Sequence, residues 1–280
     1  MKVCSYKYFV ILFLMNPSLL ICQETLEQQY QYSLNLFNKE RYFDAVTELK
    51  RLNFFDKTKI YAYQSNMLIG KAYKEGGKFS DALRYFTLAE INARNDSDLF
   101  DAKIFSVRVN ILRRTTDQAF RILDRLQFDG KFTNRKNEIY YWRGWTYIFA
   151  NDWLNAAEQF SKIDVNHPLE TLCDKTNAEM YNVTEAKVLS YIIPGAGQFY
   201  TGHYLSGLLS LGWNVLWGYL TVKAFVDQRI FDGFVVGNFL WLRFYVGNVQ
   251  NAEKFANEEN LNIVNHTLLY LQQQYQGEKP

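Results

Sequence analysis

The sequence predicts an all-α protein in which a solenoid of helical hairpins is followed by a second, apolar helical hairpin. Three observations lead to this fold class. Ala45, Ala82, Ala119 and Ala156 stand in similar segments that are each 37 residues apart. Aromatic residues make up 17% of the chain, which supplies material for packing between helices. Residues 188–222 contain no Lys, Arg, Asp or Glu, as expected of a helix without a solvated face.

Composition limits the classes of function. The 31 Lys and Arg residues nearly balance the 29 Asp and Glu residues, and the net charge of +2 gives no electrostatic basis for a nucleic-acid partner. Cys4, Cys22 and Cys173 are the only cysteines, and the first two fall in the N-terminal segment. With three scattered histidines, they predict neither a disulfide framework, nor a metal site, nor a cofactor.

The N-terminal segment is typical of a secretory signal peptide, residues 1–22. A short basic start precedes an uncharged run, residues 8–21, and polarity returns at Gln23. The alternative, a buried core helix, is disfavoured by the terminal position. Cleavage after Cys22 is the simplest version. The segment also resembles a lipoprotein processing site in which Cys22 carries the lipid, although a small residue is expected where Ile21 stands.

Residues 23–182 are predicted to hold about four repeat units. The aligned segments are RYFDAVTEL, KFSDALRYF, TTDQAFRIL and DWLNAAEQF. Two units extend the match backwards: Gly70, Tyr73, Gly77, Phe79, Ala82, Phe86 and Ala89 recur as Gly144, Tyr147, Asn151, Trp153, Ala156, Phe160 and Ile163. Small residues let two antiparallel helices approach closely, while aromatic residues fill the space between pairs.

This order of small and aromatic residues resembles the tetratricopeptide repeat, which implies a solenoid of helical hairpins. The units are longer than the usual 34 residues of that family. The third unit departs further, with Val107 and Asn110 where a glycine and an aromatic residue are expected. The alternative is an unrelated helical bundle whose apolar spacing imitates the repeat. The constant interval favours the repeat.

In the tetratricopeptide family the first helix of each unit lines a concave binding surface. The matching positions here are Tyr30, Phe37, Met67, Lys71, Lys74, Arg108, Arg113, Tyr141 and Trp145. Basic residues in the middle with aromatic residues beside them favour a protein or peptide ligand that carries acidic groups. The alternative is that the rings pack between repeats and the cations form a solvated face.

Residues 186–256 are predicted to be a membrane domain, followed by a polar tail, residues 257–280. Two transmembrane helices are expected near residues 204–222 and 230–247, because a hydrocarbon core of about 30 Å needs about 20 residues. The connection between them is basic, which places it in the cytoplasm. The predicted location is therefore the inner (cytoplasmic) membrane, with a lipid bilayer as partner and the repeat domain extracytoplasmic, in the periplasm.

A motif precedes the first of these helices. The segment PGAGQFYTG, residues 194–202, looks like the Pro-Gly-x-Gly-Gln-x-Tyr-x-Gly signature of small bacterial domains with two transmembrane helices. The marked residues of the membrane domain are Pro194, Gly195, Gly197, Gln198, Tyr200, Gly202, Asp232, Arg243, Gly247 and Asn248. The proline and glycines favour a tight bend. The alternatives are a plain loop before a buried hairpin, and a nucleotide-binding glycine loop, which the glycine spacing excludes.

No catalytic motif is visible, so the chain is predicted not to be an enzyme. The leading hypothesis is a membrane-anchored extracytoplasmic repeat scaffold for protein–protein interaction, in envelope assembly or transport. In the alternative the hairpin is the active unit, oligomerising or assisting lipid, substrate or protein movement, and the repeats regulate it. Asp232 and Arg243 would then be its functional charges. The oligomeric state is left open.

Overall fold

The computed structural model describes residues 25–280, and every regular element in that range is a helix. The all-α prediction is therefore confirmed for the described chain. The predicted signal peptide and the lipid attachment at Cys22 lie outside the described residues. The chain forms two compact units, which divide between Thr146 and Tyr147.

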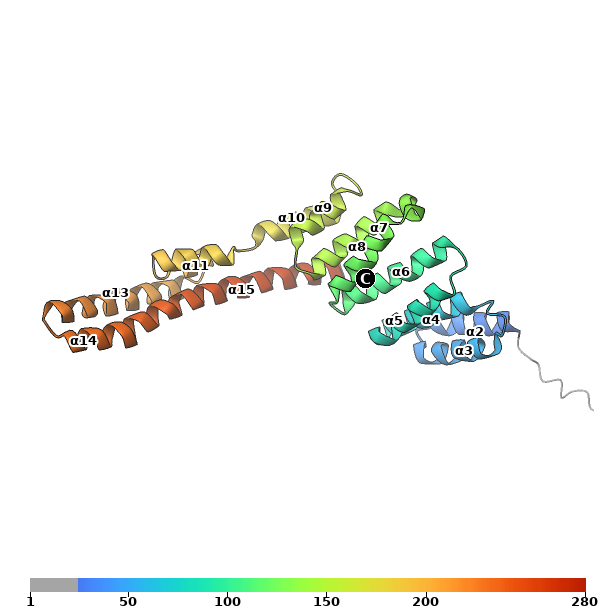
Figure 1. Ribbon diagram of the computed structural model, residues 1–280, viewed down its shortest axis with the longest axis horizontal. Coiled ribbons are helices and arrows are strands. Elements are labelled where there is room, and N and C mark those ends of the chain that lie inside the picture. The colour runs from blue at the N-terminus through green and yellow to red at the C-terminus, as the bar shows by residue number, and fades with distance from the viewer. Residues whose placement is uncertain (1–24) are drawn as a thin grey trace, which may run out of the picture. The chain divides into compact units, whose positions relative to one another are not determined.

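The first unit consists of helices that pack against their neighbours in the sequence (Figure 1). They are α2 (Leu26–Asn38), α3 (Tyr42–Phe55), α4 (Ala62–Glu75), α5 (Phe79–Ile91), α6 (Asp96–Leu112), α7 (Thr116–Phe128), the short η2 (Gly130–Arg135) and most of α8 (Lys136–Phe149). A capping box starts α2, in which Thr25 and Gln28 exchange hydrogen bonds between side chain and backbone. Because each helix contacts the next one along the chain, local sequence patterns dominate this architecture.

The 37-residue period has two structural correlates. The four aligned alanines are each 0% exposed and lie on α3, α5, α7 and α9. The turns before these helices also repeat, since Glu40, Gly77, Arg114 and Asn151 all have positive φ angles, between 58° and 69°. Each turn therefore reverses the chain through one left-handed residue at the same place in the period.

Close approach of paired helices is clearest between α4 and α5. A Cβ added to Gly70 would lie 2.6 Å from Cε1 of Phe86, which is itself fully buried. The Phe86 ring thus occupies the space that a side chain at position 70 would need. Gly70 therefore lets α4 and α5 approach closely, as expected of a small residue in a helix pair.

The second unit contains the remaining helices. They are α9 (Trp153–Ser161), α10 (Pro168–Glu179), α11 (Val183–Ile192), α12 (Ala196–Tyr200), α13 (Tyr204–Val226), α14 (Ile230–Val235), the π-helical segment η3 (Val236–Trp241) and α15 (Leu242–Gln273). Helix α13 runs back along α14, η3 and α15 as a long hairpin (Figure 1). Helices α10, α11 and α12 pack on α15.

Within residues 25–280, no helix combines the length and the apolar character that a membrane span requires. The predictions of transmembrane helices near residues 204–222 and 230–247, and of an inner-membrane location, are therefore wrong. Helix α13 has the length, but Asn214 and Thr221 place a polar stripe on its buried side. Helix α15 continues from its apolar start into a polar, charged stretch at residues 250–260.

Candidate functional site

In the first unit, four side chains from three helices form a stack that we call the cation–ring ladder: Lys71 on α4, Phe105 and Arg108 on α6, and Trp142 on α8. The Lys71 Nζ atom lies 4.5 Å from the Phe105 ring centroid. The Arg108 guanidinium carbon lies 4.8 Å from the Phe105 centroid and 4.6 Å from that of Trp142. These distances are within the range of cation–π attraction.

The ladder rests on the core of the first unit. The Phe105 ring stacks on Phe86 with centroids 5.4 Å apart. Arg108 is only 9% exposed, and Trp142 is fully buried, whereas Lys71 and Phe105 are half-buried. The open end of the ladder is therefore at α4. A partly desolvated cation on a rigid support interacts with an anion more strongly than a fully hydrated one does.

Several other residues of the predicted groove pack inside the helical array. Tyr30 stacks on Tyr61 with centroids 5.3 Å apart, and Phe37 and Tyr42 form a T-shaped pair with centroids 5.4 Å apart. Met67 and Trp145 are buried, at 7% and 2% exposure. These four aromatic and apolar side chains are thus buried or in ring contact within the first unit.

The remaining predicted groove residues lie nearer the surface. Lys74 forms an ion pair with Glu75 at 3.3 Å, and Tyr141 is half-buried in a T-shaped contact with Trp142. Arg113 is exposed where α6 ends. Phe105 and Trp142 were not among the predicted residues. The signal for Phe105 was its position three residues before Arg108, which places both on one helix face.

In the second unit, two of the marked residues, Gln198 and Asn248, form a buried hydrogen-bond cluster with Ser190 that we call the amide network. Gln198 Nε2 donates to the backbone oxygen of Asn248 at 2.9 Å and to its Oδ1 at 3.0 Å. Ser190 Oγ donates to Gln198 Oε1 at 3.1 Å, and Asn248 Nδ2 donates to the Ser190 backbone oxygen at 2.9 Å. All three residues are at most 2% exposed, so the network ties α11, α12 and α15 together.

The glycines of the motif let the backbone enter this cluster. Gly195 has φ +95°, and its N–H donates to Asn248 Oδ1 at 2.7 Å. The Gly197 N–H donates to Ser190 Oγ at 3.0 Å. A Cβ at Gly195 would lie 2.3 Å from the Gly207 oxygen, and a Cβ at Gly197 would lie 2.1 Å from the Ala186 oxygen.

The remaining marked residues lie outside the amide network. Pro194 precedes the left-handed Gly195, and Gly202 ends the motif with φ +79°. The Tyr200 hydroxyl accepts a hydrogen bond from the Asn182 backbone N–H at 3.2 Å. Asp232 lies near the turn of the hairpin, 3.7 Å from Arg229. Arg243 and Gly247 line a pocket beside Asn248. The two predicted charges, Asp232 and Arg243, are therefore not brought together.

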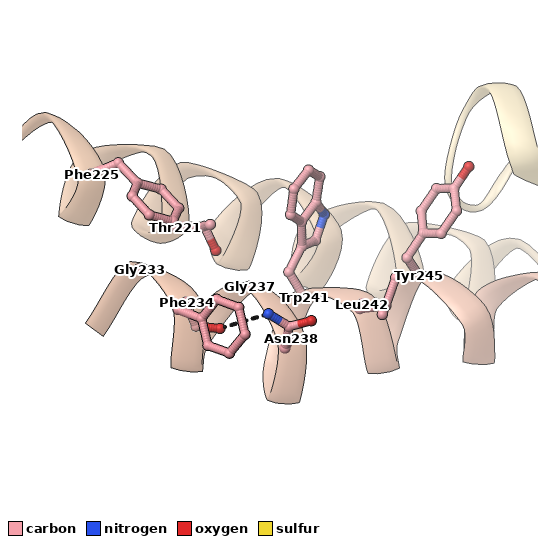
Figure 2. A pocket seen from close by; sticks show the side chains of 9 residues that line it. All are labelled: Thr221, Phe225, Gly233, Phe234, Gly237, Asn238, Trp241, Leu242 and Tyr245. Atoms are coloured by element: carbon pink, nitrogen blue, oxygen red, sulfur yellow. Dashed lines mark hydrogen bonds between the residues drawn. The ribbon is translucent and has the colours of Figure 1, made fainter. Parts of the chain in front are cut away.

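A cavity of about 500 Å³ lies along the hairpin (Figure 2). Its lining residues are Thr221, Phe225, Gly233, Phe234, Gly237, Asn238, Trp241, Leu242 and Tyr245. Its polar groups bond to backbone: Asn238 Nδ2 donates to the Phe234 oxygen at 3.1 Å, and the Tyr245 hydroxyl donates to the Tyr191 oxygen at 2.7 Å. The cavity therefore presents an apolar, uncharged lining.

Titratable groups elsewhere offer little reactive chemistry. Burial raises the pKa of the Cys173 thiol to about 12, which keeps it protonated at neutral pH. Burial also raises the pKa of Glu90, to which the Ser106 hydroxyl donates a hydrogen bond at 3.2 Å. Across residues 25–280, no three His, Cys, Asp or Glu side chains gather closely enough to hold a metal ion.

Comparisons with known proteins returned no match to a family model, a curated protein or a solved structure. The assignment to tetratricopeptide-repeat proteins with a C-terminal bacterial two-transmembrane-helix domain is therefore wrong. No family model supports either part, and no described helix can cross a membrane. Buried alanines and left-handed turns at a fixed interval specify paired helices, which unrelated all-α folds also use.

Proposed function

We propose that the chain is a helical-solenoid scaffold that binds an acidic segment of another protein on the first-helix face of its first unit. The cation–ring ladder carries this proposal. A ligand lying across α4 and α6 would meet Lys71 and the Phe105 ring, which are half-buried, with Arg108 and the buried Trp142 stacked behind them. A carboxylate would pair with Lys71, and an apolar side chain would cover the Phe105 ring.

The scaffold proposal predicts charge-dependent peptide binding at Lys71. A short labelled peptide of Glu, Leu and Ala, titrated into the full chain and followed by fluorescence anisotropy, is expected to bind. Lys71→Gln should weaken this binding about tenfold, because one partly desolvated charge pair of about 1.4 kcal/mol is lost. Binding should also weaken as salt is raised.

Lys39→Gln is the matched control, because Lys39 is an exposed lysine just after α2. It should leave the affinity unchanged. A second control replaces each Glu of the peptide by Gln, which should reduce binding to the same low level in every variant. If the Gln peptide binds the unchanged chain as tightly as the Glu peptide, the ladder does not recognise acidic ligands.

A second candidate function, self-association through the hairpin, is favoured by the apolar surface of that hairpin. Tyr219, Phe231 and Phe239 are 62%, 78% and 66% exposed, and Leu205 and Leu208 are 73% and 61% exposed. An aromatic side chain can bury about 150–250 Å². The patch therefore reaches the order of 800 Å² that each partner buries in a standard interface. Two such hairpins can pair as a four-helix bundle.

We expect the full chain to form a dimer in light scattering coupled to size-exclusion chromatography. Replacing both Leu208 and Tyr219 by Gln should shift the chain to a monomer, because the apolar patch then loses two of its exposed side chains. Lys223→Gln, an exposed change on the same helix, should leave the dimer intact. An unchanged chain that runs as a monomer, or that partitions onto phosphatidylcholine vesicles instead of pairing, would contradict self-association.

A further inference from the structure

A second pocket, of about 380 Å³, lies between α13 and α15. It shares no lining residue with the apolar cavity of Figure 2. Its size falls within the range of small-molecule sites, about 300–1,000 Å³. Unlike the apolar cavity, it has a charged side chain, which stands beside hydroxyl groups, amide groups and aromatic rings.

Arg243 gives this pocket its charge. The guanidinium makes no ion pair or hydrogen bond within the part of the chain that the structure describes, and no Asp or Glu lines the pocket. Ser206 from α13 and Asn251 from α15 add polar side chains to the same lining. A guanidinium beside further hydrogen-bond donors matches a carboxylate, which it can bind through two parallel hydrogen bonds.

Asn214 adds a hydrogen-bond acceptor to the same pocket. Its side chain is 4% exposed, and its Nδ2 donates to the Ser210 backbone oxygen at 2.8 Å. Its Oδ1 is buried and has no hydrogen-bond partner among residues 25–280. A buried acceptor is unfavourable unless a donor reaches it, so a ligand that fits this pocket should carry an N–H or O–H group.

An apolar wall completes the pocket. Trp213 and Phe244 stack with centroids 5.6 Å apart and an interplanar angle of 17°. Gly247 leaves room beside them, because a Cβ built there would have no neighbour within 4 Å. Arg243, Gly247 and Asn251 are four residues apart along α15 and so share one helix face.

We infer that this pocket binds a small carboxylate with an apolar side group next to an amide N–H, the chemistry of a peptide C-terminus or an N-acyl amino acid. Arg243 binds the carboxylate, Asn214 Oδ1 accepts the N–H, and the rings of Trp213 and Phe244 cover the apolar group. The proposal is independent of the peptide surface in the first unit, because all of its residues lie in the second.

The test titrates N-acetyl-leucine into the full chain and follows binding by calorimetry. Three probes each lack one recognised group: N-acetyl-leucinamide lacks the carboxylate, 4-methylpentanoate lacks the N–H, and N-acetylglycine lacks the apolar group. Each is expected to bind at least tenfold more weakly than N-acetyl-leucine. Equal binding of N-acetyl-leucinamide would overturn the proposal.

Three variants locate the site. Arg243→Gln should weaken N-acetyl-leucine binding at least tenfold, and Gly247→Leu should abolish it by filling the open space while favouring the helix. Arg229→Gln, at the turn of the hairpin, is the charge-matched control and should bind normally. Normal binding by Gly247→Leu would overturn the location. A hexapeptide ending in Leu separates the two sources: binding assigns the site to peptide C-termini, and exclusion assigns it to N-acyl amino acids.

Discussion

Gly197→Ala is expected to lower the free energy of unfolding of the second unit by about 3 kcal/mol, the upper part of the range for overpacked cores. The added Cβ would lie 2.1 Å from the Ala186 backbone oxygen, 2.5 Å from Ser190 Oγ and 2.7 Å from the Ala252 Cβ. A backbone oxygen cannot rotate away, so α11 must move and the amide network must open. Urea unfolding followed by circular dichroism measures the change.

Gly212→Ala supplies the matched control on α13. A Cβ at this position has no neighbour within 4 Å, and the residue lies inside a helix. The same substitution should therefore stabilise the chain by about 0.5–1 kcal/mol, because alanine loses less backbone entropy than glycine. Similar destabilisation by both variants would show that the crowding at Gly197 is not the cause.

The helix pairs of the first unit were predictable because their determinants are local. A fixed interval between small residues, such as Ala45 and Ala82, specifies where two helices approach. The left-handed turn residues follow the same interval, and Gly77 at one of them is the residue type that this backbone conformation favours. Since each helix packs on its sequence neighbour, no long-range information was needed.

The burial of the predicted groove residues could not be predicted from the sequence. Helical spacing puts Trp145 and Lys71 on first-helix faces, but burial depends on how closely the neighbouring helices approach. Trp145 is 2% exposed, whereas Lys71 is half-buried against Phe105, a residue the spacing had not selected. The spacing thus selected Lys71 and Arg108 of the ladder but not Phe105 and Trp142.

The prediction of membrane helices was wrong because it relied on the absence of charged residues alone. Uncharged polar residues leave such a segment free of charge, yet they reduce the apolar character of the helix. Asn214 and Thr221 are 4% and 6% exposed, so α13 turns these two polar side chains inward, while Leu205 and Leu208 are exposed. The motif beside it was found by resemblance. Its contacts to Asn248, fifty residues away from Gln198, required the fold.

Asn248→Leu is the second change for which we expect a large effect. It removes the acceptor of the Gly195 N–H and the donor to the Ser190 oxygen, and it leaves Gln198 Nε2 with the Asn248 backbone oxygen but without the side-chain acceptor. Each buried polar group left without a partner costs about 1–3 kcal/mol, so a loss of about 2–4 kcal/mol is expected. Asn238→Leu is the control, because that exposed amide bonds only to its own helix; it should change stability by less than about 0.5 kcal/mol.

A double-mutant cycle tests whether these contacts act as a network. Gln198→Leu alone should also destabilise the second unit, because it leaves the Ser190 hydroxyl and Asn248 Oδ1 with fewer partners. Combining it with Asn248→Leu removes a donor and its acceptor together, which costs less than leaving either one unpaired. We therefore expect the double variant to be at least about 1 kcal/mol more stable than the two single losses predict. Losses that add to within about 0.5 kcal/mol would mean that Gln198 and Asn248 stabilise the helix junction independently.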